Sequence, residues 1–179
     1  MLEIEVKAPV VDLAGLEAKL RGMGARDFGT LAQKDVYYAH PTKDFAVTDE
    51  ALRIRIENDL QLLTYKGPKI DPSSKAREEI EVSVANAKAM AEILERLGFR
   101  PVLTVTKKRK VLGLRGISVC LDRVDGLGDF VEFEFEGEEL EKGKEEIAKL
   151  MRELDVRGNE RRSYLELLLL ISQGDHQKT

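Results

Sequence analysis

The sequence predicts a single α+β domain built on eight antiparallel β-strands, with helices packed against them. Eight segments alternate apolar and polar residues with a period of two, and in nearly every one the polar positions hold charged residues. The turns between several of them, such as END at 57–59 and DGLGD at 125–129, are too short for a parallel crossover. Neighbouring strands are therefore expected to run antiparallel.

Hydrophobic period and capping residues predict the individual elements. The strands are expected at 2–8, 33–38, 51–57, 61–66, 77–84, 102–112, 117–124 and 130–136. The helices are expected at 12–23, 86–97, 138–155 and 160–171. The polar stretches 40–50 and 67–76 are expected to be loops, and 172–179 a flexible C-terminal tail. Because 179 residues suit one core and no linker interrupts them, residues 1–179 are expected to form a single domain.

A short repeat suggests how the sheet is built. The tetrapeptide EIEV occurs at 3–6 and again at 79–82, each time followed by a helical segment and then another strand. We interpret this pattern as a diverged internal duplication of a strand–helix–strand unit. Two such units about a pseudo-twofold axis would bring their acidic strand faces together.

The charged strand faces have two explanations. An antiparallel sheet with one solvated face produces the same alternation. A solvated face, however, ordinarily includes Ser, Thr, Asn and Gln, whereas these strands repeat Glu-x-Glu and Arg-x-Arg. The other explanation is a sheet curled shut around charges of both signs, and a barrel of about eight strands has room for one small ligand.

A buried charged lining indicates the kind of ligand. Charges of both signs that are desolvated together need partners that complete their pairing. A polyphosphate with a divalent metal supplies such partners, because Lys and Arg neutralise phosphate oxygens while carboxylates hold a hard cation. Mg²⁺ or Mn²⁺ is favoured over Zn²⁺ because the candidate ligands are all oxygen.

Composition excludes several other classes. A net charge of -4 argues against a nucleic-acid binder with a basic face. The single Cys120 and the lack of a secretory segment before the first strand favour a cytoplasmic protein. The longest apolar run, LELLLLIS at 165–172, is too short for a membrane span. The helix that contains it either contacts a twin subunit in a homodimer or closes one flank of the barrel.

The charged pairs, taken in order, resemble a known family. The matching segments are Glu3-x-Glu5-x-Lys7, QKDVYY at 33–38, Arg53-x-Arg55, Lys66 in TYKGP, Arg77-x-Glu79-x-Glu81, Lys107-x-Arg109, LD at 121–122 and EFE at 132–134. Together they resemble the CYTH superfamily, which joins class IV adenylyl cyclases with thiamine and inorganic triphosphatases. The segments GLGDFVEFE at 126–134 and RSYLELL at 162–168 are most similar to the class IV cyclase branch.

This resemblance implies a triphosphate tunnel, which is a closed eight-stranded antiparallel β-barrel with helices packed outside. Two sets of charged residues would line it. The set that would bind the substrate phosphates is Lys7, Arg53, Arg55, Lys66, Arg77, Lys107 and Arg109, all but Arg77 with a catalytic role. The set that would hold Mg²⁺ or Mn²⁺ is Glu3, Glu5, Glu81, Asp122, Glu132 and Glu134. Tyr37 and Tyr38 are expected to be strand aromatics packed under a helix.

The expected activity is conversion of ATP to cyclic AMP and pyrophosphate. The alternative is a triphosphatase that hydrolyses inorganic tripolyphosphate, thiamine triphosphate or a nucleoside triphosphate. The sequence has no Trp and no clear base-stacking platform, which keeps this alternative open. A third hypothesis, a non-enzymatic polyphosphate or nucleotide-binding module, would have little use for so many paired carboxylates.

Overall fold

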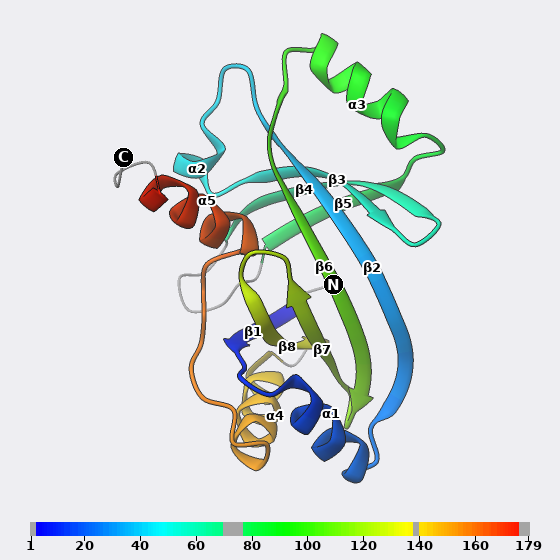
Figure 1. Cartoon of the computed structure of the whole chain (residues 1–179), viewed down its shortest axis with the longest axis vertical. Helices are drawn as coiled ribbons and strands as arrows, with labels where there is room; N and C mark the ends of the chain where they lie inside the picture. The colour runs from blue at the N-terminus through cyan, green and yellow to red at the C-terminus, as the bar shows by residue number, and fades with distance from the viewer. Residues whose placement is uncertain (1–2, 70–76, 138–139, 176–179) are drawn as a thin grey trace. The chain divides into compact units, whose positions relative to one another are not determined.

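The computed structural model describes residues 3–69, 77–137 and 140–175 (Figure 1). The strands are β1 (Glu3–Pro9), β2 (Arg26–Ala39), β3 (Ala51–Glu57), β4 (Leu60–Lys69), β5 (Arg77–Ser83), β6 (Arg100–Leu114), β7 (Ile117–Val124) and β8 (Gly128–Glu136). The helices are α1 (Leu13–Gly22), α2 (Phe45–Thr48), α3 (Ala87–Arg96), α4 (Leu140–Glu153) and α5 (Tyr164–Asp175). The predicted α+β fold with eight antiparallel strands is confirmed.

The strands follow the order β1-β8-β7-β6-β2-β3-β4-β5. β1 and β5 stand at the two ends of this order, so for the described part of the chain the closing of the sheet into a barrel is not confirmed and stays a prediction. By contact the chain divides into two compact units, and β2 and β6 each contribute one part to each unit. Unit 1 comprises the described residues of 1–31 and 108–161, and unit 2 comprises 32–69, 77–107 and 162–175.

Several element boundaries differ from the sequence predictions; for example, α5 begins at Tyr164 and not at 160, and β4 extends to Lys69, into the predicted loop 67–76. β2 begins at Arg26, whereas the prediction placed its start near 33. The first residues of β2 are mostly exposed and lack an apolar alternation, so the hydrophobic period did not mark them as a strand. Part of the predicted loop 40–50 is the short helix α2, which Asp44 caps by accepting a hydrogen bond of 2.9 Å from the Ala46 N–H. Residues 172–175 of the predicted tail belong to α5, while 176–179 and loop residues 70–76 lie outside the described residues.

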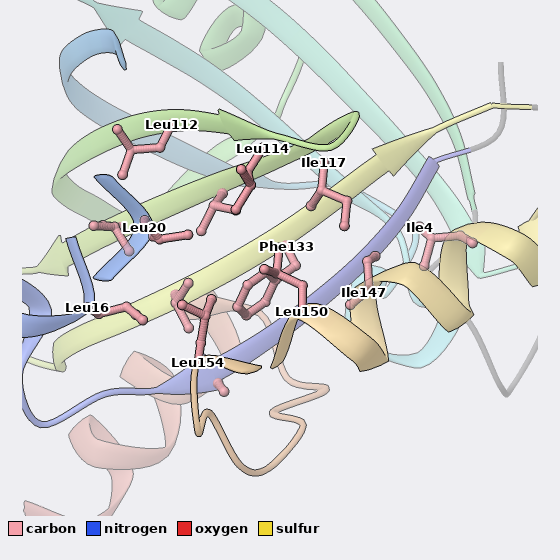
Figure 2. Packing of buried hydrophobic residues seen from close by; sticks show 14 residues of the cluster. Ile4, Leu16, Leu20, Leu112, Leu114, Ile117, Phe133, Ile147, Leu150 and Leu154 are labelled. Atoms are coloured by element: carbon pink, nitrogen blue, oxygen red, sulfur yellow. The ribbon is translucent and has the colours of Figure 1, made fainter. Parts of the chain in front are cut away.

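The core of unit 1 lies between its strands and two helices. Figure 2 shows Leu16 and Leu20 of α1 and Ile147 and Leu150 of α4 gathered around Phe133 of β8. Phe133 and Leu20 are fully buried. Since full burial of each such side chain is worth about 1.5–3 kcal/mol, this cluster holds the opposite, charged face of β1 and β8 in a fixed register.

The core of unit 2 is smaller and lies under α3. Tyr38 of β2 with Leu52 and Ile54 of β3 packs against Ala87 and Leu94 of α3. These three strand residues alternate with polar ones, so the packing fixes which face of β2 and β3 is left for charged side chains. Among the helices that the structure describes, none has both the length and the apolar character that crossing a membrane requires.

The two strand–helix–strand units of the predicted repeat share their local geometry. Asp12 accepts a hydrogen bond of 2.8 Å from the Gly15 N–H at the start of α1, and Asn86 accepts one of 3.0 Å from the Ala89 N–H at the start of α3. A glycine with positive φ follows each helix, Gly24 after α1 and Gly98 after α3. These matching caps support the duplication, whereas the pseudo-twofold axis stays a prediction.

Candidate functional site

The charged face of the strands is buried in both units. Lys7 and Asp35 are 1% and 2% exposed, and Asp122 is 0% exposed. Arg53, Lys107, Arg109 and Glu132 are also buried. The explanation of this face as solvated is therefore wrong for these residues. Ionic side chains are this deeply buried only when they are paired or bind a ligand.

Unit 1 carries a buried group that we call the acidic cluster, defined as Lys7, Arg109, Asp122, Glu132 and Glu134. Its geometry follows from strand register, because Lys7 of β1 lies directly opposite Glu132 of β8, and β7 borders β8 on the other side. The Lys7 Nζ lies 3.9 Å from the Glu132 Oε1. Residues on one strand face recur at every second position, so Glu134 faces the same side.

Arg109 of β6 is the centre of the acidic cluster. Its guanidinium donates two parallel hydrogen bonds to Asp122, with Nε–Oδ1 at 2.7 Å and Nη2–Oδ2 at 2.6 Å. It also donates to Glu134, with Nη1–Oε1 at 3.1 Å, and to Glu132. Burial acts to lower the pKa of Arg109, but the charge of Glu132 and the hydrogen bond to Asp122 outweigh it and raise the pKa well above its ordinary value. Arg109 is therefore permanently charged.

Cys120 of β7 borders the acidic cluster as a neutral thiol. Its Sγ lies 3.6 Å from the Glu134 Oε2 and donates a hydrogen bond to it. Burial raises the pKa of this thiol, and the charges of Glu134 and Glu132 raise it further against the opposing effect of Arg109. Because the thiolate is the reactive form, Cys120 is not suited to act as a nucleophile.

Unit 2 carries a second buried group, the basic cluster, defined as Asp35, Arg53, Arg55 and Lys107. Asp35 of β2 lies opposite Arg55 of β3 in the strand register. Arg55 donates two hydrogen bonds of 2.7 Å to the two carboxylate oxygens of Asp35, and the Arg53 Nη1 donates one of 3.2 Å. Arg53 and Arg55 thus share one carboxylate, and the positive charge of Lys107 also acts on it.

The electrostatics of the basic cluster favour an anion. Burial alone would raise the pKa of Asp35, but the hydrogen bond from Arg55 and the charges of Arg53, Arg55 and Lys107 outweigh it and lower the pKa. The Arg53 Nε–H is buried and, within the described residues, has no hydrogen-bond acceptor. A buried donor without an acceptor is costly, so this N–H is suited to bind an anionic oxygen of a ligand.

The two neighbouring tyrosines of β2 point to opposite faces. Tyr38 packs in the core under α3, as the sequence predicts. Tyr37 is different, because it lies opposite Arg53 in the register and interacts with Arg53 and Asp35. Burial raises the pKa of the Tyr37 phenol, against the opposing charge of Arg53. The prediction that Tyr37 packs under a helix is not confirmed.

Asp35 and Tyr37 are the site residues that sequence reasoning missed. Both belong to the quoted segment QKDVYY, in which Gln33, Asp35 and Tyr37 share one parity. In the structure these three residues lie opposite Glu57, Arg55 and Arg53 respectively. The signal was this shared parity, but its use would have required knowing that β2 pairs with β3.

Three further predicted site residues lie on β4 and β5 of unit 2. Lys66 of β4 forms an ion pair with Glu79 of β5. The Glu81 Oε2 accepts a hydrogen bond of 2.8 Å from the Thr64 Oγ1. Arg77 lies 4.0 Å from Asp49, measured from its Nη2 to the Asp49 Oδ1. Glu79 and Glu81 are exposed.

Two predicted metal ligands lie on β1. Glu5 is half-buried and lies opposite Glu134 in the register. The backbone of Glu3 pairs with Glu136, and its side chain lies outside what the structure describes. The register thus places Glu5 next to the acidic cluster.

The acidic cluster fits a hard cation by its donor chemistry. Its three carboxylates outnumber its two cations, and all its acceptors are oxygens, which Mg²⁺ and Mn²⁺ prefer. Arg109 binds all three carboxylates, and no group of three or more His, Cys, Asp and Glu side chains is placed to hold a metal ion in the described part of the chain. The donors therefore fit the cation, while the ligand roles stay predictions.

Comparison with known proteins identifies the family. The CYTH domain family profile matches residues 1–164. The chain belongs to the CYTH family. A candidate adenylate cyclase of Methanocaldococcus jannaschii is 38% identical over 172 residues, which cover 93% of this chain and 98% of that protein. The resemblance to the CYTH superfamily is thus confirmed.

Solved structures of CYTH-like proteins share the fold. A protein of Pyrococcus horikoshii OT3 is 44% identical with a TM-score of 0.85, and the match covers 93% of this chain and 98% of that one. A candidate adenylyl cyclase from Hippeastrum with a dominant triphosphatase activity is 21% identical with a TM-score of 0.70, and the match covers 92% of each chain. The second likeness shows the fold alone.

Proposed function

We propose that this CYTH protein is a divalent-metal-dependent enzyme that converts ATP to cyclic AMP and pyrophosphate. The observation that carries the proposal is the buried Arg53 Nε–H of the basic cluster, which has no hydrogen-bond acceptor within the described residues. A buried donor that lacks an acceptor is costly, so an anionic oxygen of a ligand would stabilise this arrangement. The planar guanidinium fork matches phosphate oxygens, which favours a polyphosphate chain over a simple carboxylate.

In this proposal the basic cluster binds the triphosphate. Arg53 and Lys107 contact phosphate oxygens directly, and Arg55 is oriented by its two hydrogen bonds to Asp35. When the ribose 3′ oxygen forms its bond to the α-phosphorus, the bond to pyrophosphate breaks and negative charge grows on the leaving group. Fixed cations in a buried site stabilise that charge without reorganising. Lys66 and Arg77 would extend the phosphate-binding surface beyond the basic cluster.

The acidic cluster provides the metal ligands in this proposal. Glu132 and Glu134 with Glu3 and Glu5 would hold Mg²⁺ or Mn²⁺, and Asp122 and Glu81 would support them. The bound cation would supply Lewis-acid polarisation of the phosphate oxygens and favour ionisation of the attacking hydroxyl. Lys7 and Arg109 orient the carboxylates, since Arg109 binds three of them.

The second candidate is a triphosphatase that uses the same residues. Here water attacks the terminal phosphorus, the bond from that phosphorus to the diphosphate breaks, and orthophosphate and the diphosphate are the products. The Hippeastrum protein combines this fold with a dominant triphosphatase activity, so the fold does not decide between the two reactions. The name of the Methanocaldococcus jannaschii relative, which is 38% identical, is the reason for placing the cyclase first.

One experiment separates the candidates. The protein is incubated with ATP, thiamine triphosphate and tripolyphosphate, each with Mg²⁺ or Mn²⁺, and the products are separated by chromatography. Cyclic AMP with pyrophosphate supports the cyclase, and released orthophosphate supports the triphosphatase. Arg53→Ala should abolish most turnover, while Arg123→Ala, whose side chain is 70% exposed, is the matched control. No product from any substrate with either metal would contradict both candidates.

A further inference from the structure

The aromatic ring of Tyr164, at the start of α5, contacts Lys107 of the basic cluster. The Lys107 Nζ lies 4.8 Å from the centroid of the Tyr164 ring, within the range of a cation–π interaction. Both residues are buried, Lys107 on β6 and Tyr164 at the first position of α5. An ammonium in a desolvated site gains more from a ring face than an exposed one does.

The start of α5 is fixed by local sequence. Ser163 and Glu166 form a capping box, in which the Glu166 N–H donates a hydrogen bond of 3.1 Å to the Ser163 Oγ. The Ser163 N–H donates one of 2.6 Å to the Glu166 Oε2 in return. Because Tyr164 lies inside this box, the first turn of α5 holds its ring in place below the ammonium.

The ring differs from a carboxylate in what it does to the cation. The carboxylate of Asp35 accepts two hydrogen bonds from Arg55 and cancels its charge. An aromatic face attracts an ammonium through its quadrupole, without cancelling the charge and without using an N–H donor in a hydrogen bond. Tyr164 therefore stabilises a charged Lys107 without itself neutralising that charge.

We propose that Tyr164 is a positioning residue, whose ring holds Lys107 charged and correctly placed to bind a phosphate oxygen of the substrate. This inference rests on the proposed function of the basic cluster. It also gives α5 a role in the site, since the docking of this helix sets the position of a phosphate-binding cation. Loss of the ring weakens phosphate binding even though Tyr164 does not touch the phosphate.

The test replaces the Tyr164 side chain with another aromatic ring and with an aliphatic side chain. Binding of tripolyphosphate is measured by calorimetry without metal for the wild type, Tyr164→Phe and Tyr164→Leu. Phe keeps the ring face and Leu keeps an apolar side chain, so Tyr164→Phe should bind like the wild type. Tyr164→Leu should bind between about twofold and thirtyfold more weakly, the range expected for one cation–π contact. In a Lys107→Met background, Tyr164→Leu should have no further effect.

Two outcomes would overturn the inference. One is equal binding by Tyr164→Leu and the wild type, and the other is equal weakening by Phe and Leu. If Tyr164→Leu does not fold, pentafluorophenylalanine at position 164 keeps the ring shape but reverses its quadrupole, and it should weaken binding as Leu would. If the wild type binds no tripolyphosphate, the proposed function fails. The inference is then tested by the NMR signals of the Lys107 ε-methylene protons, which the ring must shift upfield in the wild type and not in Tyr164→Leu.

Discussion

Replacing Asp35 by Asn tests the balance of charge in the basic cluster most directly. The change is nearly isosteric, so it removes a negative charge with little effect on packing. Asp35 is 2% exposed and accepts hydrogen bonds from two guanidinium groups. An amide in its place offers one acceptor oxygen and turns two donors toward Arg55 and Arg53. Two buried guanidinium groups are then left without their counter-ion.

The magnitude follows from this geometry. Removing one partner of a buried, hydrogen-bonded ion pair costs about 3–5 kcal/mol, because the remaining charge is buried and uncompensated. A domain of this size loses roughly 2–4 °C in melting temperature for each kcal/mol, so the expected decrease is about 6–20 °C at neutral pH. Tripolyphosphate should recover part of this loss, since it supplies the missing negative charge.

Urea unfolding and thermal melting followed by circular dichroism measure this loss. The matched control is Asp155→Asn, which removes an ion pair with Arg157 whose two side chains are 72% and 88% exposed. Exposed pairs contribute about 0–1 kcal/mol, so the control should melt close to the wild type. If Asp35→Asn unfolds within 1 kcal/mol of the wild type, the basic cluster does not depend on Asp35, and the charge argument for the site fails.

Three further changes test other parts of the proposal. Arg53→Ala should lower the turnover rate about 10²–10³-fold if Arg53 stabilises developing charge, and full turnover would remove it from the site. Glu134→Gln should raise the Mg²⁺ or Mn²⁺ concentration that gives half-maximal rate, and an unchanged metal titration contradicts a ligand role. Contacts from Lys43, Thr48 and Tyr65 lower the pKa of Glu50 to about 2 from 4.5, so its contribution to stability is complete above 4.5 and is lost as the pH falls toward 2. Glu50→Gln should therefore make the free energy of unfolding, measured in urea, less steeply dependent on pH across this window.

The alternation in the sequence predicted the strands well because each strand has one apolar face. In β3, for example, Leu52 and Ile54 pack under α3 while Arg53 and Arg55 face the other side. The same period of two predicted that Lys107 and Arg109 share a face, and both are buried. Burial of that face could not be read from a single strand, because an open sheet produces the same pattern.

The sequence could not predict which charged residues pair with one another, for a different reason. Which carboxylate meets Arg55 depends on the register of β2 against β3, and register is set by the packing of both strands. Asp35 was therefore present in a quoted segment but had no assigned partner. Tyr164 was likewise part of a helix that was predicted to pack or to dimerise, and its contact with Lys107 depends on where α5 begins. Capping residues predict that start only to within a few positions.

The partners of the three cations in the basic cluster imply different roles for them. Arg55 has two hydrogen bonds to Asp35, Arg53 has one longer bond and a free Nε–H, and Lys107 contacts a ring. Arg55 is thus satisfied within the protein, whereas the Arg53 Nε–H can still bind a ligand, and in the proposal Lys107 binds the ligand as well. We therefore expect Arg55→Met to lower the free energy of unfolding more than Lys107→Met does, because it leaves Asp35 buried with a single weak donor.

The same pair of variants should show the reverse order in calorimetry with tripolyphosphate. In the proposal Lys107 binds a phosphate oxygen directly, whereas Arg55 is bound to Asp35, so the affinity of Lys107→Met should fall by more than that of folded Arg55→Met. Arg55→Met could instead lose more affinity for tripolyphosphate than Lys107→Met, with little loss of unfolding free energy. That result would show that the guanidinium bound to Asp35 is the group that binds phosphate. In that case the carboxylate orients a phosphate ligand and does not merely balance charge, and Asp35→Asn should weaken tripolyphosphate binding as strongly as it weakens the fold.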